Sequence, residues 1–468
     1  MSCMGAAYAL SPRAFPVPRE PVRLGPVCVA TVAPVGAGAC FIAPPSSSPP
    51  CRTPFIGLLD GVLRAGHATG LMKRHPLERD ALLEHARTAT GLSDFGDPWF
   101  LHPFEALLES VRAEARLNAV GTLAAAKQFG HVLQGRLRAQ AWFARHPEIL
   151  ARPLRRPVVI VGPMRSGTTR LHRLLASDLR SFETISPVPR DDFIEVMSGV
   201  KDDFRPVLAA RIMRVARLAN PRTLAIHPTG PYEPEEELGL LVASMWGMKH
   251  EAQWQVPSYA RWCEGEDAVP AYRHMADLLR LIGWSQRESS LRPWILKTPQ
   301  HMLDLSALLE VFPDARLIFT HRDPRQVVGS AASLAWNQTI LYSDHVDPHA
   351  VGREWLRKTA LMIERMRTAR AAIAPDRMMD VHYDAMDRDW EGTMRCVYRF
   401  LDLDIEPALP AMAGYLQRAR ALRSEPHDYS LSAFGLSESD VMDRLDDYVR
   451  AFAVAMDTPG EVASRARG

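Results

Sequence analysis

The stretch VVIVGPMRSGTTRLHRLL, residues 158–175, constrains the fold of this chain more than any other segment. It begins with four apolar β-branched residues, Gly162 follows them, and leucines then recur at helical spacing from Leu171. This pattern predicts a strand, a tight turn and a helix in succession. The turn therefore lies at a helix N-terminus, where unpaired backbone N–H groups and the positive end of the helix dipole favour a phosphate or a similar anion.

This turn departs from the nucleotide-binding pattern G-x-x-x-x-G-K-[ST] at its most important position. Gly162 and Gly167 have the required spacing and Thr169 occupies the hydroxyl position, but Thr168 stands where the pattern has lysine. A positive charge returns inside the turn at Arg165. We therefore expect a phosphorylated nucleotide that is handled differently from ATP.

The composition limits the classes of function. The chain has 468 residues, of which 47% are hydrophobic and 24% charged, as in an ordinary globular protein. Its formal net charge is +2, so we expect no nucleic-acid partner and only local basic character. Four of the six cysteines precede residue 52 and no pair has C-x-x-C spacing, so neither a disulfide framework nor a metal site is predicted.

The N-terminal third divides into two parts. Residues 1–54 form a Pro/Ala-rich leader that we expect to be disordered. Its uncharged run 27–43 has an alternative interpretation as a signal-peptide core, although proline and glycine interrupt the run. Residues 55–154 repeat apolar residues at three- and four-residue spacing, which predicts a helical region that packs on the core, covers an acceptor or forms a dimer. No segment beyond the leader has the length and apolarity of a membrane span, so we expect no stable membrane insertion.

A second informative segment, WILKTPQHMLDLSALLEVFPDARLIFTHRDPRQVVGSAASL, covers residues 294–334. It predicts a strand that ends beside Lys297, a helix through about Val311, another strand, and a loop and helix that begin at Asp323. In an open parallel sheet, ligands bind in the crevice beyond the carboxyl ends of the strands. Lys297 is thus predicted to face the same crevice as the glycine-rich turn.

Arg322 and Ser330 follow the second of these strands. Because one lies at the strand end and the other on the next helix, together they could hold a phosphate by charge and hydroxyl donation. Taken singly, each has an ordinary explanation. Arg322 could form a surface ion pair with Asp323 or Asp314, and Ser330 could be a small packing residue.

Three motifs, PMRSGTT, LKTPQH and THRDPRQVVGS, occur together in this chain. Together they resemble the sulfotransferase superfamily that uses 3′-phosphoadenosine 5′-phosphosulfate (PAPS). They are most similar to its bacterial branch with P-x-R-S-G-T-T loops, which also resembles tyrosylprotein sulfotransferases. The resemblance covers about residues 71–445. It implies a P-loop-like, three-layer α/β fold with a central parallel sheet flanked by helices over residues 155–445, and a C-terminal helix and tail over 446–468.

The resemblance also implies roles for individual residues. Lys297 matches the family lysine that sits against the bridging oxygen of PAPS, and Arg322 and Ser330 match the pair that holds the 3′-phosphate. The site for the 5′-phosphosulfate matches five consecutive residues, Arg165, Ser166, Gly167, Thr168 and Thr169. Because the leaving group of sulfuryl transfer is a phosphate dianion, cations aimed at the bridging oxygen could replace the lysine and magnesium of a kinase, so no metal is expected.

The mechanism implied is an in-line displacement in which an acceptor oxygen attacks sulfur, Arg165 and Lys297 stabilise charge, and a base takes the acceptor proton. The favoured base is Glu183, near the place where the family has a carboxylate after the loop helix. His301, one helical turn after Lys297, is the competing candidate. A further alternative is an acidic cluster composed of Glu233, Glu235, Glu236 and Glu237, which could equally be the ordinary acidic start of a helix.

The acceptor is expected to be a hydroxyl of a small molecule, lipid or sugar. The aromatic residues between the two nucleotide motifs are mostly core, but some could line an apolar acceptor pocket. The alternatives are a P-loop kinase or NTPase that uses ATP, and a catalytically inert nucleotide-binding scaffold. A cytoplasmic location is expected from the cytosolic donor, and the oligomeric state is left open between a monomer and a homo-oligomer.

Overall fold

The computed structural model describes residues 53–73, 76–185, 210–211, 214–215, 218–220, 233–285, 292–422 and 430–457. All but the last two residues of the leader expected over 1–54 lie outside these ranges, as does the end of the expected C-terminal tail. The described residues belong to one unit by their contacts.

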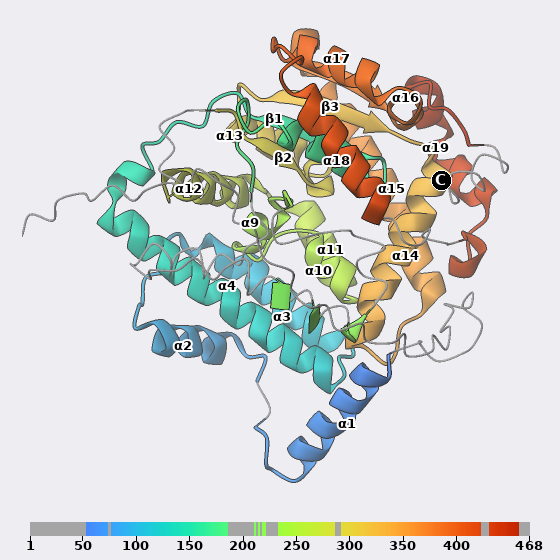
Figure 1. The fold of residues 1–468 in the computed structure, drawn as a ribbon. Coiled ribbons are helices and arrows are strands. Elements are labelled where there is room, and N and C mark those ends of the chain that lie inside the picture. Colours follow the sequence, from blue (N-terminus) through green and yellow to red (C-terminus); the bar gives the residue numbers. More distant parts are fainter. Residues whose placement is uncertain are drawn as a thin grey trace, which may run out of the picture. The chain divides into compact units, whose positions relative to one another are not determined.

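Among the described residues, four parallel strands form a central sheet in the spatial order β2-β1-β3-β4 (Figure 1). The register pairs Val159 of β1 with Leu296 on one side and Leu317 on the other. Because all pairings are parallel, the carboxyl ends of the strands meet at one edge, which is where ligands bind in such sheets. The strands are β1 (Val158–Val161), β2 (Ile295–Lys297), β3 (Arg316–His321) and β4 (Met378–His382).

Successive residues of these strands enter two different hydrophobic cores. In β1, Val159 and Val161 belong to the larger cluster, whereas Val158 and Ile160 belong to the smaller one. This alternation follows from the two-residue period of a strand. It confirms the predicted α/β fold in which helices cover a parallel sheet.

The smaller core packs under four helices, and in Figure 1 α17 lies above the strands. These are α5 (Thr168–Ala176), α16 (Tyr383–Arg388), α17 (Trp390–Phe400) and α18 (Leu409–Leu422).

The larger core lies on the other face of the sheet, where α9 and α10 are visible below the strands in Figure 1. After the N-terminal region, its helices are α9 (Leu238–Val242), α10 (Lys249–Gln253), α11 (Pro257–Gly265), α12 (Val269–Ser285), α13 (Leu305–Val311), α14 (Pro324–Tyr342), α15 (Pro348–Arg370) and α19 (Glu438–Ala451).

The helical region predicted over residues 55–154 is present, and it shares this larger core with the sheet. Phe104 and Phe129 pack edge to face with ring centroids 5.6 Å apart, and both belong to the cluster that also contains Val159. The region is therefore a layer of the same core rather than an appendage. Its helices are α1 (Pro54–Ala68), α2 (Arg79–Thr90), α3 (Leu101–Ala113) and α4 (Ala119–Arg145).

Two predicted boundaries differ from the structure. The helix expected after Lys297 is divided into a 3₁₀ turn, Pro299–Met302, and α13, because a proline begins the turn and Asp304 separates it from the helix. The boundary expected at residue 445 lies inside α19, whose capping box at Ser437 begins the helix earlier.

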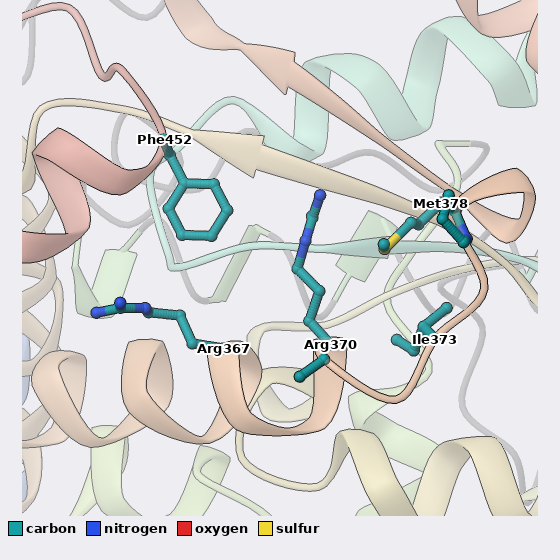
Figure 2. A pocket seen from close by; sticks show the side chains of 7 residues that line it. Arg367, Arg370, Ile373, Met378 and Phe452 are labelled. Atoms are coloured by element: carbon teal, nitrogen blue, oxygen red, sulfur yellow. The ribbon is translucent and has the colours of Figure 1, made fainter.

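A cavity of about 450 Å³ opens at the amino end of β4 (Figure 2). Arg370 of α15 extends between Phe452 and Met378, and both of its terminal nitrogens donate to the Asp380 carboxylate at 2.6 Å. The cavity therefore runs along β4: Met378 begins this strand, whereas Phe452 stacks on His321, the last residue of β3, with ring centroids 4.5 Å apart. Within the described ranges, no helix combines the length and the apolarity needed to cross a membrane.

Candidate active site

The glycine-rich turn runs from the end of β1 to the start of α5 and has an unusual backbone. Arg165 and Gly167 both adopt the left-handed region, with φ of 70° and 89°. A Cβ at Gly162 would lie 1.9 Å from Thr320 Oγ1 of the neighbouring strand, so this position requires glycine. The turn is thereby pressed against β3, and its backbone leads directly into the N-terminus of α5.

Ser166 holds the turn in this shape. Its hydroxyl donates to the carbonyl of Pro163 at 2.7 Å and lies 2.6 Å from the Thr320 hydroxyl. Ser166 is 1% exposed, so its hydroxyl supports the turn from the buried side. The left-handed backbone of Arg165, a non-glycine residue, is strained, and such strain recurs at functional sites.

Two residues that are distant from the turn in the sequence, Arg322 and Ser330, contact Arg165. Arg165 Nε donates to Ser330 Oγ at 3.0 Å, and Arg322 Nη1 donates to the Arg165 carbonyl at 2.7 Å. Arg322 Nε is buried and has no hydrogen-bond partner among the described residues. A buried guanidinium nitrogen without a partner is costly, and a phosphate oxygen would satisfy it. The structure thus brings the predicted anion-binding residues together.

Lys297 ends β2 at the same edge of the sheet. Its Nζ lies 3.2 Å from Thr169 Oγ1, at the start of α5, and it pairs with the carboxylate of Glu236. The Lys297 side chain is 2% exposed, whereas that of Glu236 is 18% exposed. A carboxylate in direct contact with this lysine is therefore reachable from outside the protein.

Glu237, the next residue, is fully buried and serves a different purpose. Its Oε2 accepts the backbone N–H of Lys297 at 2.8 Å, and its Oε1 lies 2.5 Å from His301 Nε2. The other ring nitrogen of His301 lies 2.8 Å from the Tyr272 hydroxyl. Burial acts to raise the pKa of Glu237, but the neighbouring His301 and the Lys297 N–H hold it below its ordinary value. Glu237 is thus a buried carboxylate that fixes the backbone of Lys297.

Residues 157–407 match the model of the sulfotransferase family, Sulfotransfer_3, which is more than half of the chain. The chain belongs to the sulfotransferase family. This confirms the resemblance to that superfamily indicated by the three motifs.

The chain is also similar to individual sulfotransferases in sequence and in structure. Over 301 residues the chain is 26% identical to the omega-hydroxy-beta-dihydromenaquinone-9 sulfotransferase Stf3 of Mycobacterium bovis and to that of Mycobacterium tuberculosis, and each alignment covers 60% of this chain and 70% of the relative. The crystal structure of sulfotransferase STF1 from M. tuberculosis H37Rv superposes with a TM-score of 0.68 at 28% identity, covering 80% of this chain and 99% of STF1. Sulfotransferase STF9 from Mycobacterium avium shares the fold, with a TM-score of 0.73 at 23% identity over 82% of this chain and 99% of STF9.

Glu183 of this sulfotransferase does not lie with the other predicted site residues. Its backbone bonds to Pro293 and Ile295 at the amino end of β2, away from the edge where Lys297 lies. Its carboxylate is 1% exposed and pairs with Arg152 at 3.3 Å. The sequence spacing from Arg165 could not reveal this placement, because it depends on how the segment after α5 runs along β2.

The remaining candidates for the base have distinct surroundings. His301 is completely buried against Glu237 and Tyr272, so it has no access to an acceptor. Glu233 lies 3.8 Å from Arg173, and Glu235 bonds through its backbone to Ile185. Only Glu236, among the candidates in the described residues, combines exposure with contact to Lys297.

The sequence analysis did not identify Tyr383, which completes the turn. The Arg322 guanidinium lies 4.0 Å from the Tyr383 ring centroid, and a Cβ at Gly167 would come within 2.9 Å of the same ring. Tyr383 directly follows β4, just as Lys297 and Arg322 stand at the ends of β2 and β3. This shared position at a strand end was the available signal.

Proposed function

We propose that this sulfotransferase transfers a sulfuryl group from PAPS to a hydroxyl of a small-molecule, lipid or sugar acceptor by in-line displacement. The observation that carries the proposal is the meeting of Arg165, Lys297 and Arg322, which come from three different strand ends, around one glycine-rich turn. Three cations gathered at a helix N-terminus fit a donor that carries several phosphate-type charges. Family membership favours sulfuryl transfer over the kinase alternative.

The donor would be held along the turn. The turn from Arg165 to Thr169 would supply backbone N–H groups and threonine hydroxyls for the 5′-phosphosulfate, while Ser166 keeps the turn in shape. Arg322, with its unpartnered buried nitrogen, and Ser330 would hold the 3′-phosphate. When bound, PAPS supplies the sulfuryl group and leaves as 3′-phosphoadenosine 5′-phosphate.

Glu236 would activate the acceptor. Its carboxylate lies beside Lys297 with the side chain 18% exposed, so it could take the proton of an attacking hydroxyl. Lys297 and Arg165 would stabilise the negative charge that develops on the departing phosphate. Glu237 and His301 are then not the base but hold Lys297 in place from behind. This assignment selects one member of the acidic cluster that the sequence left open.

The acceptor is best supported as an apolar alcohol. The Stf3 relatives are named for a hydroxylated dihydromenaquinone, which is a lipid. We therefore favour a hydroxylated lipid over a sugar.

Calorimetric titration with 3′-phosphoadenosine 5′-phosphate tests the donor without knowledge of the acceptor, and ATP with magnesium is the parallel ligand. We expect binding of the former only; a preference for ATP would reject the donor assignment. Transfer of radiolabelled sulfate from PAPS to a hydroxylated isoprenoid, compared with a free sugar, then tests the acceptor class. Binding without transfer to any hydroxyl would favour the inert scaffold.

A further inference from the structure

The N-terminal helix α1 carries an apolar face that the rest of the described protein leaves uncovered. Phe55, Leu58 and Val62 recur at three- and four-residue spacing on one side of the helix, with exposed fractions of 41%, 71% and 49%. The opposite side is also apolar, and there Ile56 and Leu63 are buried. A helix that is apolar on both sides is normally covered on both sides.

A second described segment lies beside the start of α1 and also exposes apolar side chains. Thr53 Oγ1, at the N-cap of α1, donates to the carbonyl of Ala219 at 2.9 Å, which joins the start of the helix to residues 218–220. Large apolar side chains there, and in the turn that folds back on the end of α1, are exposed as well. The docking face consists of Phe55, Leu58, Val62, Leu71, Met72, Val215 and Leu218.

This concentration of apolar surface is specific to the docking face. In the part of the chain that the structure describes, Leu150 and Leu179 are the only other large apolar side chains with comparable exposure. Scattered exposed apolar residues need no explanation, but several on one helix face and on the segments that contact this helix indicate an interaction surface.

Most of the exposed charges beside the docking face are positive. Lys73, Arg211 and Arg214 are exposed. The one acidic residue among the described residues of 53–73 and 210–220 is Asp60, which is 2% exposed and pairs with Arg64. Arg64 also pairs with Asp344, whose side chain is 34% exposed, so this partly exposed carboxylate is already paired with a base. An apolar surface that is bordered mainly by basic side chains matches the surface of an anionic bilayer.

The docking face is also connected to the donor site. Asn220 donates to the carbonyl of Asn337 at 3.1 Å, on the same helix α14 that carries Ser330. We propose that the docking face seats the enzyme on an anionic membrane surface, from which the lipid acceptor is taken; the acceptor part of this statement rests on the proposed function. Contact with the bilayer is peripheral, through one face of a helix.

Flotation of the purified full chain with lipid vesicles tests the proposal. Wild-type protein should float with vesicles of phosphatidylcholine plus phosphatidylglycerol, and less with phosphatidylcholine alone or at high salt. The double variant Leu58→Glu/Val62→Glu should partition about tenfold or more weakly, because it places charges in the apolar interface. The matched control is Leu150→Glu/Leu179→Glu, which changes exposed apolar residues outside the docking face and should float like wild type.

Binding of 3′-phosphoadenosine 5′-phosphate, measured in the same three proteins, should be unchanged, and this separates the membrane proposal from the proposed donor. Failure of wild-type protein to float with either vesicle would overturn membrane docking even if the nucleotide binds. So would an equal loss in the control variant. If sedimentation shows a dimer that only Leu58→Glu/Val62→Glu dissociates, and no vesicle binding, a second copy of the chain covers the docking face instead.

Discussion

At the scale of single residues, the proposed catalysis depends on the direction in which each charged side chain points. Arg165 is held in the left-handed conformation and lies against Ser330, so its side chain stays inside the turn. Arg165→Ala should lower the turnover number by about two to three orders of magnitude, as for the loss of a group that stabilises transition-state charge. Binding of 3′-phosphoadenosine 5′-phosphate should weaken but persist, and steady-state kinetics with calorimetry would measure both.

Arg322→Ala provides the contrast to this variant. Because Arg322 would contact a phosphate that does not react, its loss should chiefly weaken donor affinity and leave the turnover number at saturating donor similar. Unchanged transfer in Arg165→Ala would show that Arg165 takes no part in the transfer step. An unaltered donor affinity in Arg322→Ala would contradict the 3′-phosphate assignment.

Glu236 and Glu237 are neighbours with opposite surroundings. Glu236→Gln should reduce the turnover number by about two to four orders of magnitude, since the base is lost while its size is kept. Donor-product binding should be retained or tightened, because Lys297 is released from its ion pair. If Glu183→Gln has the larger effect on turnover and leaves the protein as stable as wild type, the base assignment is incorrect.

Tyr272 acts at a distance from the reacting edge. Tyr272→Phe removes only the hydroxyl that lies 2.8 Å from His301, so Lys297 should lose part of its orientation and turnover should fall about tenfold with little change in donor affinity. The control is Tyr398→Phe, which removes a buried hydroxyl bonded to Asp178 in the other core. It should lower stability by about 1 kcal/mol without changing turnover. Equal turnover in both variants would show that His301 needs no such support.

At the scale of elements, the junction of β1 with α5 requires glycine at position 162. Gly162→Ala would place a Cβ 1.9 Å from Thr320 Oγ1, so the turn must move and donor-product affinity should fall about tenfold or more. The control is Gly130→Ala in the middle of α4, where the nearest atom is 4.0 Å from the added Cβ. That change should stabilise the protein by up to about 1 kcal/mol. Calorimetry and thermal unfolding of both variants would test the contrast, which fails if Gly162→Ala binds normally.

The sequence predicted these elements well where one short pattern decided them. The β-branched run at 158–161, the glycine-rich turn and the strand ending at Lys297 all lie where expected. Their signals are local, since period, glycine spacing and strand ends are written in a few residues. The division of the helix after Lys297 into two elements depends on Pro299, which begins the 3₁₀ turn, and helical spacing of apolar residues does not show it.

Predicting the site required more than local patterns. The sequence predicts the proximity of Arg165, Lys297 and Arg322, because parallel strands end at one edge of the sheet. The placement of Glu183 at the amino end of β2, and the burial of His301, depend on contacts between segments far apart in the chain. The different roles of Glu236 and Glu237 depend on which of two adjacent side chains faces outward, which no spacing rule reveals.

At the scale of the whole molecule, the N-terminal helices and the sheet are energetically one body. Phe104 and Phe129 belong to the same buried cluster as Leu279 and Val328. A chain that begins at residue 155 would expose that cluster and should therefore fail to fold cooperatively, as judged by near-UV circular dichroism and thermal unfolding. Removal of residues 1–52 alone should leave the unfolding transition in place. A cooperative transition in the shorter chain would instead make residues 155–445 an independent domain.

The gathering of cations at one edge of the sheet has a kinetic consequence. The molecule as a whole has a formal net charge of only +2, so it exerts little long-range attraction on a polyanion. Arg165 and Arg322 concentrate the positive potential in one place. Capture of a multiply charged ligand should therefore slow as ionic strength rises, while its rate of escape, governed by short contacts, should change far less. Salt would then act on how often the enzyme is loaded and much less on how long it stays loaded.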